Sequence, residues 1–160
     1  MEPLIKVNVD GAWDKITTSS GSGVIIRDAR GKFIAGSCRS CIAGSAIEAE
    51  AIALVDGLKL VKQLNLDNTV MESDSQELIS ALGNHIEKGN WRIYPFLIEF
   101  HHIRHLLSSV SWNWISREAN RAADAAAKLA KSRLCTEVWV NIPPTSLVSV
   151  LTNDGLPCSH

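Results

Sequence analysis

The periodicity of the apolar residues changes along the chain from that of strands to that of helices, and this change constrains the fold most strongly. Apolar and polar residues alternate from Ile5 to Asp10, as in a strand with one buried face. Two further short strands are predicted at residues 21–27 and 32–38, with a hairpin turn at residues 28–31. The N-terminal part is therefore expected to form a three-stranded antiparallel meander.

After residue 45 the pattern alternates between helices and strands. Residues 46–64 carry apolar residues at spacings of three and four, which is typical of an amphipathic helix. The other expected elements are short strands at residues 69–71 and 110–116 and helices at residues 75–86, 93–107 and 120–132. Strands that alternate with helices should pair in parallel. We therefore expect an α/β fold with element order βββαβααβα, in which helices pack on a mixed five-stranded sheet.

The chain of 160 residues is long enough to bury one substantial core. We assign residues 1–135 to this domain and residues 136–160 to a C-terminal extension, because the extension fits the preceding pattern poorly. Pro143 and Pro144 interrupt regular structure there, and residues 145–152 could form a short helix.

Charge and composition exclude some classes of protein. Sixteen Lys and Arg against 17 Asp and Glu give a net charge of −1, which argues against a dedicated high-affinity DNA-binding protein. No apolar run approaches the ~18–20 residues that span a bilayer. Cys38 and Cys41 have the spacing of a zinc motif, but Cys135 and Cys158 are too far apart to complete it. We therefore expect an intracellular protein with reduced thiols, acting as a monomer without membrane contact.

Four carboxylates, Asp10, Glu50, Asp74 and Asp124, occur at the ends of expected elements or on a helix flank. Each has a structural explanation when taken singly: a turn, a solvated helix residue, a helix cap and a favourable charge in a first helical turn. If the first and fourth strands are neighbours, however, Asp10 and Asp74 emerge near the same sheet edge. Converging carboxylates repel one another unless a cation lies among them.

Divalent cations would remove that repulsion. Mg²⁺ prefers oxygen ligands and keeps waters that substrate phosphate oxygens can replace. Two such ions about 4 Å apart can activate a water and stabilise the leaving oxygen in phosphodiester cleavage. The carboxylates therefore predict a site for two Mg²⁺ ions, for which Mn²⁺ can substitute.

Several segments together resemble the ribonuclease H family, in particular its plant-type ribonuclease-H-like domains. Residues 7–12 are similar to the first strand of the family, and residues 49–54 match its AExxAL helix motif. Residues 72–75 contain its SDS strand end, and residues 117–124 resemble the REANxxAD segment of the plant group. The matches occur in order over about residues 4–132, and this ordered set is highly specific.

The resemblance implies a ribonuclease-H-like fold and metal-binding catalytic roles for Asp10, Glu50, Asp74 and Asp124. The AExxAL match selects Glu50 over Glu48, which the helical period alone does not. By similarity, Glu50 would also contact the 2′-hydroxyl that distinguishes RNA from DNA. The implied partner is an RNA–DNA hybrid, and the implied activity is metal-dependent endonucleolytic hydrolysis of its RNA strand, leaving a 3′-hydroxyl and a 5′-phosphate.

The chain also departs from the family. A histidine-bearing loop that many members carry before the last helix is missing, because Ser116 runs almost directly into Asn120. Ala46 and Ile47 stand where other members often have two Asn that read the RNA strand, and a basic protrusion is absent. These departures keep open a second interpretation, a catalytically weak or inactive module that binds nucleic acid or a protein partner. A transposase or integrase core shares the architecture, but the SDS and AExxAL matches argue against it.

Two tryptophans near the end of the pattern invite a role in base stacking. Trp112 and Trp114 alternate with Asn113 in the strand expected at residues 110–116, so both lie on one strand face. Packing in the core is the better explanation of that arrangement.

Overall fold

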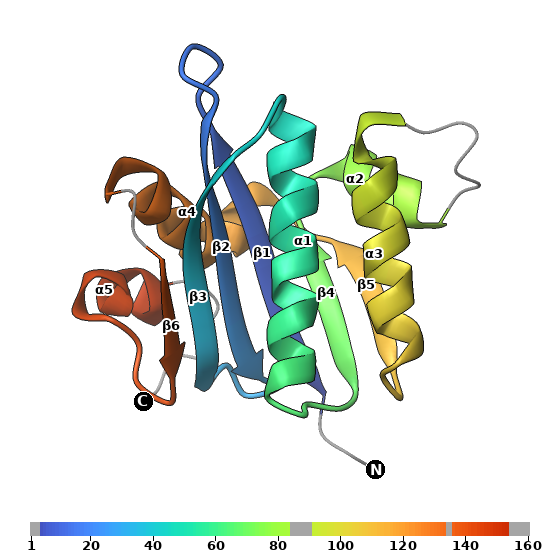
Figure 1. The fold of residues 1–160 in the computed structure, drawn as a ribbon. Coiled ribbons are helices and arrows are strands. Elements are labelled where there is room, and N and C mark those ends of the chain that lie inside the picture. The colour runs from blue at the N-terminus through green and yellow to red at the C-terminus, as the bar shows by residue number, and fades with distance from the viewer. Residues whose placement is uncertain (1–3, 84–90, 134–135, 154–160) are drawn as a thin grey trace.

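The computed structural model describes residues 4–83, 91–133 and 136–153. Within these residues one six-stranded sheet runs in the order β5-β4-β1-β2-β3-β6 (Figure 1). The strands are β1 (Ile5–Trp13), β2 (Ser19–Asp28), β3 (Phe33–Ile42), β4 (Thr69–Ser73), β5 (Val110–Trp114) and β6 (Glu137–Val140). The helices are α1 (Ala46–Gln63), α2 (Gln76–Gly83), α3 (Tyr94–His105), α4 (Arg121–Arg133) and α5 (Thr145–Asn153), with short 3₁₀ turns η2 (Trp91–Ile93) and η3 (Arg117–Asn120).

The α/β class and the expected order of the first nine strands and helices are confirmed. β1, β2 and β3 form the antiparallel meander, and β4 pairs in parallel with both β1 and β5. The pairing of β1 with β4 is the arrangement that brings the carboxylates of these strands to one edge.

The predicted number of strands is wrong, because β6 adds a sixth. It pairs antiparallel with β3, from Ala35 opposite Val140 to Cys38 opposite Glu137. Only four residues form this edge strand, and most of their side chains are exposed, so it lacks the alternation that reveals a half-buried strand. Both β6 and α5 lie within residues 136–160, and the domain boundary at residue 135 stays a prediction.

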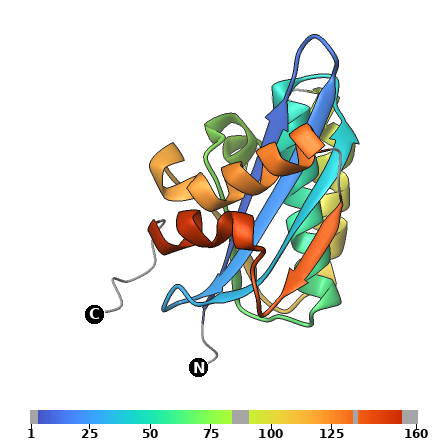
Figure 2. The same cartoon turned by 90° about the vertical axis from the view of Figure 1, so that its left-hand side faces the viewer.

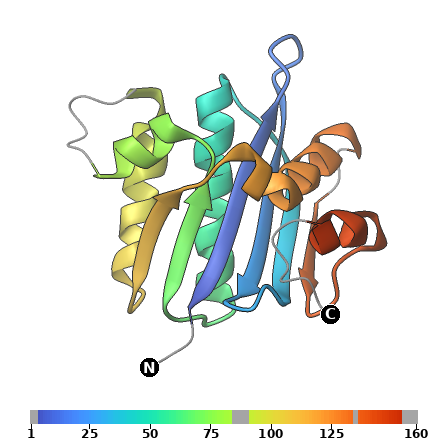
Figure 3. The ribbon, with the colours of Figure 1, turned by 180° about the vertical axis from the view of Figure 1, so that it is seen from behind.

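Helices cover both faces of the sheet. α1 and α3 lie on one face, and α4 and α5 lie on the other, as the side and back views show (Figures 2 and 3). Val7 and Val9 of β1 are fully buried with Leu54 and Leu58 of α1 in the main core cluster. Because side chains alternate along a strand, Asn8 and Asp10 lie on the opposite face, which α4 covers.

Small residues let α4 approach β2 closely. The buried side of α4 consists of alanines, and Gly21 and Gly23 of β2 lie directly beneath it. A Cβ atom added at Gly23 would lie 2.3 Å from the carbonyl oxygen of Ala123. This close packing holds the start of α4, and with it Asp124, against the sheet next to β1.

The expected reduced thiols agree with the structure at two positions, since neither Cys38 nor Cys41 forms a disulfide bond. Cys135 and Cys158 lie outside the described residues. In the described part of the chain, no helix is long and apolar enough to cross a bilayer.

Replacing Gly23 by alanine should lower the free energy of unfolding by about 1–3 kcal/mol, because the added methyl group meets helix backbone that cannot move aside freely. Chemical denaturation measures this change. The matched control is Gly83→Ala, where an added Cβ would have no neighbour within 4 Å. Equal stability of the two variants would show that α4 does not lie this close to β2.

Candidate metal centre

The centre begins at Asp10, on the side of β1 that faces α4. Its carboxyl group is almost completely buried, with 5% of the residue exposed. Asn8 of β1 pairs with Glu72 of β4 in the parallel register. Asp10 lies two residues after Asn8, and Asp74 lies two residues after Glu72, directly beyond the end of β4, so both follow on the same face of the sheet. A carboxylate oxygen of each of these two residues lies within 4.8 Å of the other, as the pairing of the two strands predicts.

Glu50 reaches the same place from the first turns of α1. Gly11 lets the helix approach β1, since a Cβ there would lie 2.3 Å from the carbonyl carbon of Ala49. The backbone N–H of Gly11 then donates to Oε2 of Glu50 at 3.3 Å. β4 has already ended at Ser73, so the side of β1 beyond that point is open to the Glu50 side chain.

Glu48 serves the start of the helix instead. Its carboxylate accepts a hydrogen bond from the backbone N–H of Gly44 at 2.8 Å, and its own N–H donates to the N-cap residue Ser45 at 3.3 Å. The choice of Glu50 over Glu48 thus agrees with the geometry, because only Glu50 faces Asp10.

Three of the four predicted carboxylates form one cluster. One oxygen each of Asp10, Glu50 and Asp74 can be chosen so that all three lie within 4.8 Å of one another. Asp124 is not part of this group. It lies close enough to Asp10 to raise the pKa of that group, but its Oδ2 is also 2.9 Å from Nζ of Lys128, one helical turn further along α4.

The cluster is strongly unfavourable for negative charge. Burial, followed by the nearby charges of Glu50 and Asp74, raises the pKa of Asp10 to about 10. Burial and the charge of Asp74 raise the pKa of Glu50 to about 7, although hydrogen bonds from Asp10 and the Gly11 N–H oppose the shift. Burial also raises the pKa of Asp74. Without a cation Asp10 therefore tends to hold its proton at neutral pH, and ionising all three groups together is unfavourable.

This donor set fits a hard divalent cation. Among the described residues, the ion pairs found do not include Asp10, Glu50 or Asp74, although the nearby charge of Arg117 lowers the pKa of Asp74. Three oxygens from carboxylates, partly buried and close together, match the oxygen preference of Mg²⁺ and Mn²⁺.

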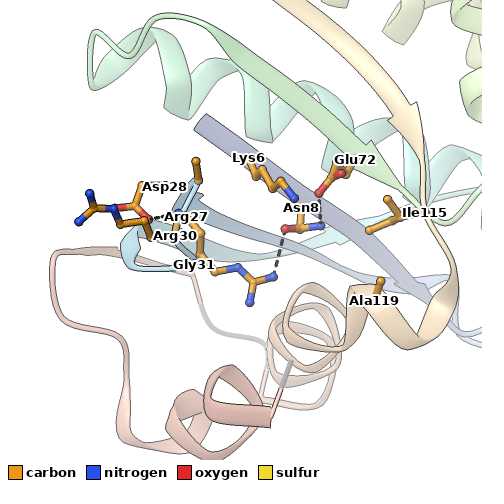
Figure 4. A pocket seen from close by; sticks show the side chains of 10 residues that line it. Lys6, Asn8, Arg27, Asp28, Arg30, Gly31, Glu72, Ile115 and Ala119 are labelled. Atoms are coloured by element: carbon orange, nitrogen blue, oxygen red, sulfur yellow. Dashed lines mark hydrogen bonds between the residues drawn. The ribbon is translucent and has the colours of Figure 1, made fainter. Parts of the chain in front are cut away.

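A pocket lies on the sheet face of Asp10, lined in part by Lys6 and Asn8 of β1. It has a volume of about 670 Å³, and Lys6, Asn8, Arg27 and Glu72 contribute to its wall (Figure 4). Nη2 of Arg27 donates to Oδ1 of Asn8 at 3.2 Å, and Nδ2 of Asn8 donates to Oε1 of Glu72 at 3.2 Å. These bonds connect β2, β1 and β4 at Asn8 and Glu72, which lie two residues before Asp10 and Asp74 in the chain.

Two residues next to the cluster have contacts that the sequence analysis did not predict. Trp112 packs against the core as expected, but Trp114 is 45% exposed, so its predicted burial is wrong. The indole N–H of Trp114 donates to the backbone oxygen of Asp74 at 3.1 Å and so fixes the turn after β4.

Asn120, expected only to begin a helix, is 1% exposed and donates through Nδ2 to the carbonyl oxygen of Val9 at 3.0 Å. Neither contact has a signal in the local sequence pattern.

Comparisons with known proteins agree with this architecture. The sequence matches the reverse transcriptase-like family over residues 8–130, which is most of the chain, whereas no curated protein matches it. Among solved structures, the N-terminal RNase H domain of Rv2228c from Mycobacterium tuberculosis superposes with a TM-score of 0.75 at 16% identity, covering 82% of this chain and 96% of that one. RNase H1 of Halobacterium salinarum gives a TM-score of 0.75 at 18% identity, covering 81% and 98%.

A third similar structure, LC11-RNase H1 in complex with an RNA/DNA hybrid, has a TM-score of 0.72 at 19% identity and covers 83% of this chain and 99% of that one. At these identities the likeness concerns the fold, and the sequence match carries the family. The chain therefore belongs to the reverse transcriptase-like family and is a ribonuclease-H-like domain.

Proposed function

We propose that this protein is a divalent-metal-dependent endonuclease that hydrolyses the RNA strand of RNA–DNA hybrids. The observation that carries the proposal is the cluster of Asp10, Glu50 and Asp74, in which one carboxylate oxygen of each residue lies within 4.8 Å of the others. The solved structure of LC11-RNase H1, which has the same fold, contains an RNA/DNA hybrid, and this supports the choice of substrate.

The residues of the cluster would hold the metal ions. Asp10 lies at its centre, with Glu50 contributed by α1 and Asp74 by the end of β4, while Asp124 approaches Asp10 from α4. When bound, two Mg²⁺ ions, for which Mn²⁺ can substitute, would supply Lewis-acid stabilisation and an activated water for phosphodiester cleavage. Water adds across the bond between phosphorus and the 3′-oxygen, so the products carry a 3′-hydroxyl and a 5′-phosphate.

The chain's own residues determine where the substrate is placed. The Gly11 N–H holds the Glu50 carboxylate beside β1, and the Trp114 indole holds the backbone at Asp74. We further propose that Glu50 contacts the RNA 2′-hydroxyl, the group by which a protein distinguishes RNA from DNA. The protein would act as an intracellular monomer.

Two observations favour a second candidate function, a module that binds nucleic acid or a protein partner with little catalysis. Asp124 forms an ion pair with Lys128, which competes with any role as a metal ligand. The connection from β5 to α4 consists of only a short 3₁₀ turn, η3, and has no histidine. Both features would lower turnover while leaving the three-carboxylate cluster in place.

Substituting Asp10→Asn or Asp74→Asn should reduce cleavage of a labelled RNA–DNA hybrid in Mg²⁺ by at least about a hundredfold, because the metal ions lose ligands and with them several kcal/mol of charge stabilisation. Single-turnover assays with gel analysis measure the change. Glu99→Gln on α3 is the matched control, since Glu99 is a half-exposed carboxylate paired with Lys59 outside the cluster. If wild type and all three variants are inert but still bind hybrid, the binding module is the correct interpretation.

Without divalent ions, stability should fall as the pH rises from about 5 to about 9. The pKa values of Asp10 and Glu50 are raised in the folded state, to about 10 and about 7, so the folded protein binds more protons than the unfolded chain over this range. Mg²⁺ should reverse the fall, because an ion bound only by the folded state raises the Tm.

Thermal unfolding in chelator and in Mg²⁺, at several pH values, measures both effects. Asp10→Asn removes one buried acid, so its Tm should depend less on pH and respond little to Mg²⁺. A wild-type Tm that is flat with pH and indifferent to Mg²⁺ would contradict the electrostatic description of the cluster.

A further inference from the structure

Asn120 occupies the junction between the sheet and α4. It is the last residue of η3, immediately before α4, and only 1% of it is exposed. Its Nδ2 donates to the carbonyl oxygen of Val9 at 3.0 Å, across 111 positions of sequence. Val9 directly precedes Asp10, so this bond fixes the β1 backbone at the base of the Asp10 side chain.

The same side chain also acts on the second carboxylate. A hydrogen bond from Asn120 lowers the pKa of Asp74 and so opposes the effect of burial. An amide nitrogen has two hydrogens, which allows it to donate to two acceptors. One side chain therefore acts both on β1, through the bond to Val9, and on Asp74, whose pKa it lowers.

Unlike the side-chain nitrogen of Asn120, its side-chain oxygen forms no hydrogen bond within the described part of the chain. Oδ1 is buried and has no hydrogen-bond partner among the described residues. Buried polar atoms are almost always paired, and the exceptions concentrate at functional sites. Because the two donor contacts leave Oδ1 unpaired, the orientation of the side chain follows from the donors and not from the full use of its polar atoms.

We propose that Asn120 is a positioning residue of the metal centre: its amide holds the β1 backbone and Asp74 together and so sets the separation of the Asp10 and Asp74 carboxylates. The inference rests on the proposed function, because it takes these carboxylates to be ligands of a divalent ion. Asn120 itself is not assigned a place among the ligands. Its effect passes through the distance between the two groups that it holds.

Asn8 provides a matched control for a purely structural role. It is also a buried asparagine, 2% exposed, whose side chain joins neighbouring strands. Its Nδ2 donates to Glu72 and its Oδ1 accepts from Arg27, within the pocket wall and not the carboxylate cluster (Figure 4). Loss of either asparagine should destabilise the fold, but only loss of Asn120 should alter the metal ligands.

Isothermal titration calorimetry with Mn²⁺ tests the inference on wild type, Asn120→Ala, Asn8→Ala and Asp10→Asn. Removing a residue that orients metal ligands should weaken ion affinity about 10–100-fold. We expect that loss for Asn120→Ala, an affinity within about threefold of wild type for Asn8→Ala, and little binding by Asp10→Asn. Denaturant unfolding of each variant gives the stability change separately.

The outcomes separate this inference from the proposed function. If wild type and Asp10→Asn bind Mn²⁺ equally, or neither binds, the metal centre and the proposed function both fail. If Asp10→Asn loses binding but Asn120→Ala keeps it, only the role of Asn120 is overturned. Equal losses of affinity in Asn120→Ala and Asn8→Ala would also overturn it, because a general loss of stability then explains both.

A measurement on the wild-type protein applies even if Asn120→Ala does not fold. In ¹⁵N-labelled protein the side-chain amide resonances of Asn120 and Asn8 report on their separate contacts. Saturating Mg²⁺ should shift the Asn120 side-chain resonances and leave those of Asn8 nearly unchanged. Asn120 resonances that stay in place while the ion binds would overturn the proposal.

Discussion

The parallel pairing of β1 with β4 is the constraint on which the candidate site depends. Asn8 lies opposite Glu72 in this register, so Asp10 and Asp74 follow at equivalent distances on the same face. A shift by one residue would turn one of the two carboxylates to the face that α1 covers. The buried valines of β1 prevent such a shift, because Val7 and Val9 would then leave the core for the polar face. The packing that stabilises the fold therefore also aligns the site.

The site works against the stability of the domain that carries it. Burial raises the pKa values of Asp10, Glu50 and Asp74, and the charges of neighbouring carboxylates add to this effect, so ionising all three without a cation is unfavourable. A sequence selected for stability alone would place apolar or paired side chains there. Hydrogen bonds from the surrounding residues hold two of these groups in place. The Gly11 N–H donates to the Glu50 carboxylate, and the Trp114 indole N–H donates to the backbone oxygen of Asp74. The proposed binding of divalent ions would account for this unfavourable arrangement of charge.

Much of this arrangement could be predicted from the sequence, since it follows from strong periodic patterns. β1 and α1 each have an apolar face that the sequence pattern reveals. The position of β4 beside β1 is a condition of the site prediction, and the structure meets it. The rest depends on contacts between distant segments. β6 is short and exposed, so its pairing with β3 leaves no period-two signal. The burial of Asn120 under Val9 and the exposure of Trp114 depend on the path of the chain between β5 and α4, which no local pattern determines.

The central claim is that the three clustered carboxylates bind divalent metal ions together, and diffraction from crystals grown with Mn²⁺ tests it most directly. Anomalous difference density collected near the manganese absorption edge locates the ions without reference to activity. Our account predicts a manganese peak within coordinating distance of Asp10, Glu50 and Asp74. Fully occupied manganese elsewhere in the crystal, with no peak among these three side chains, would contradict it.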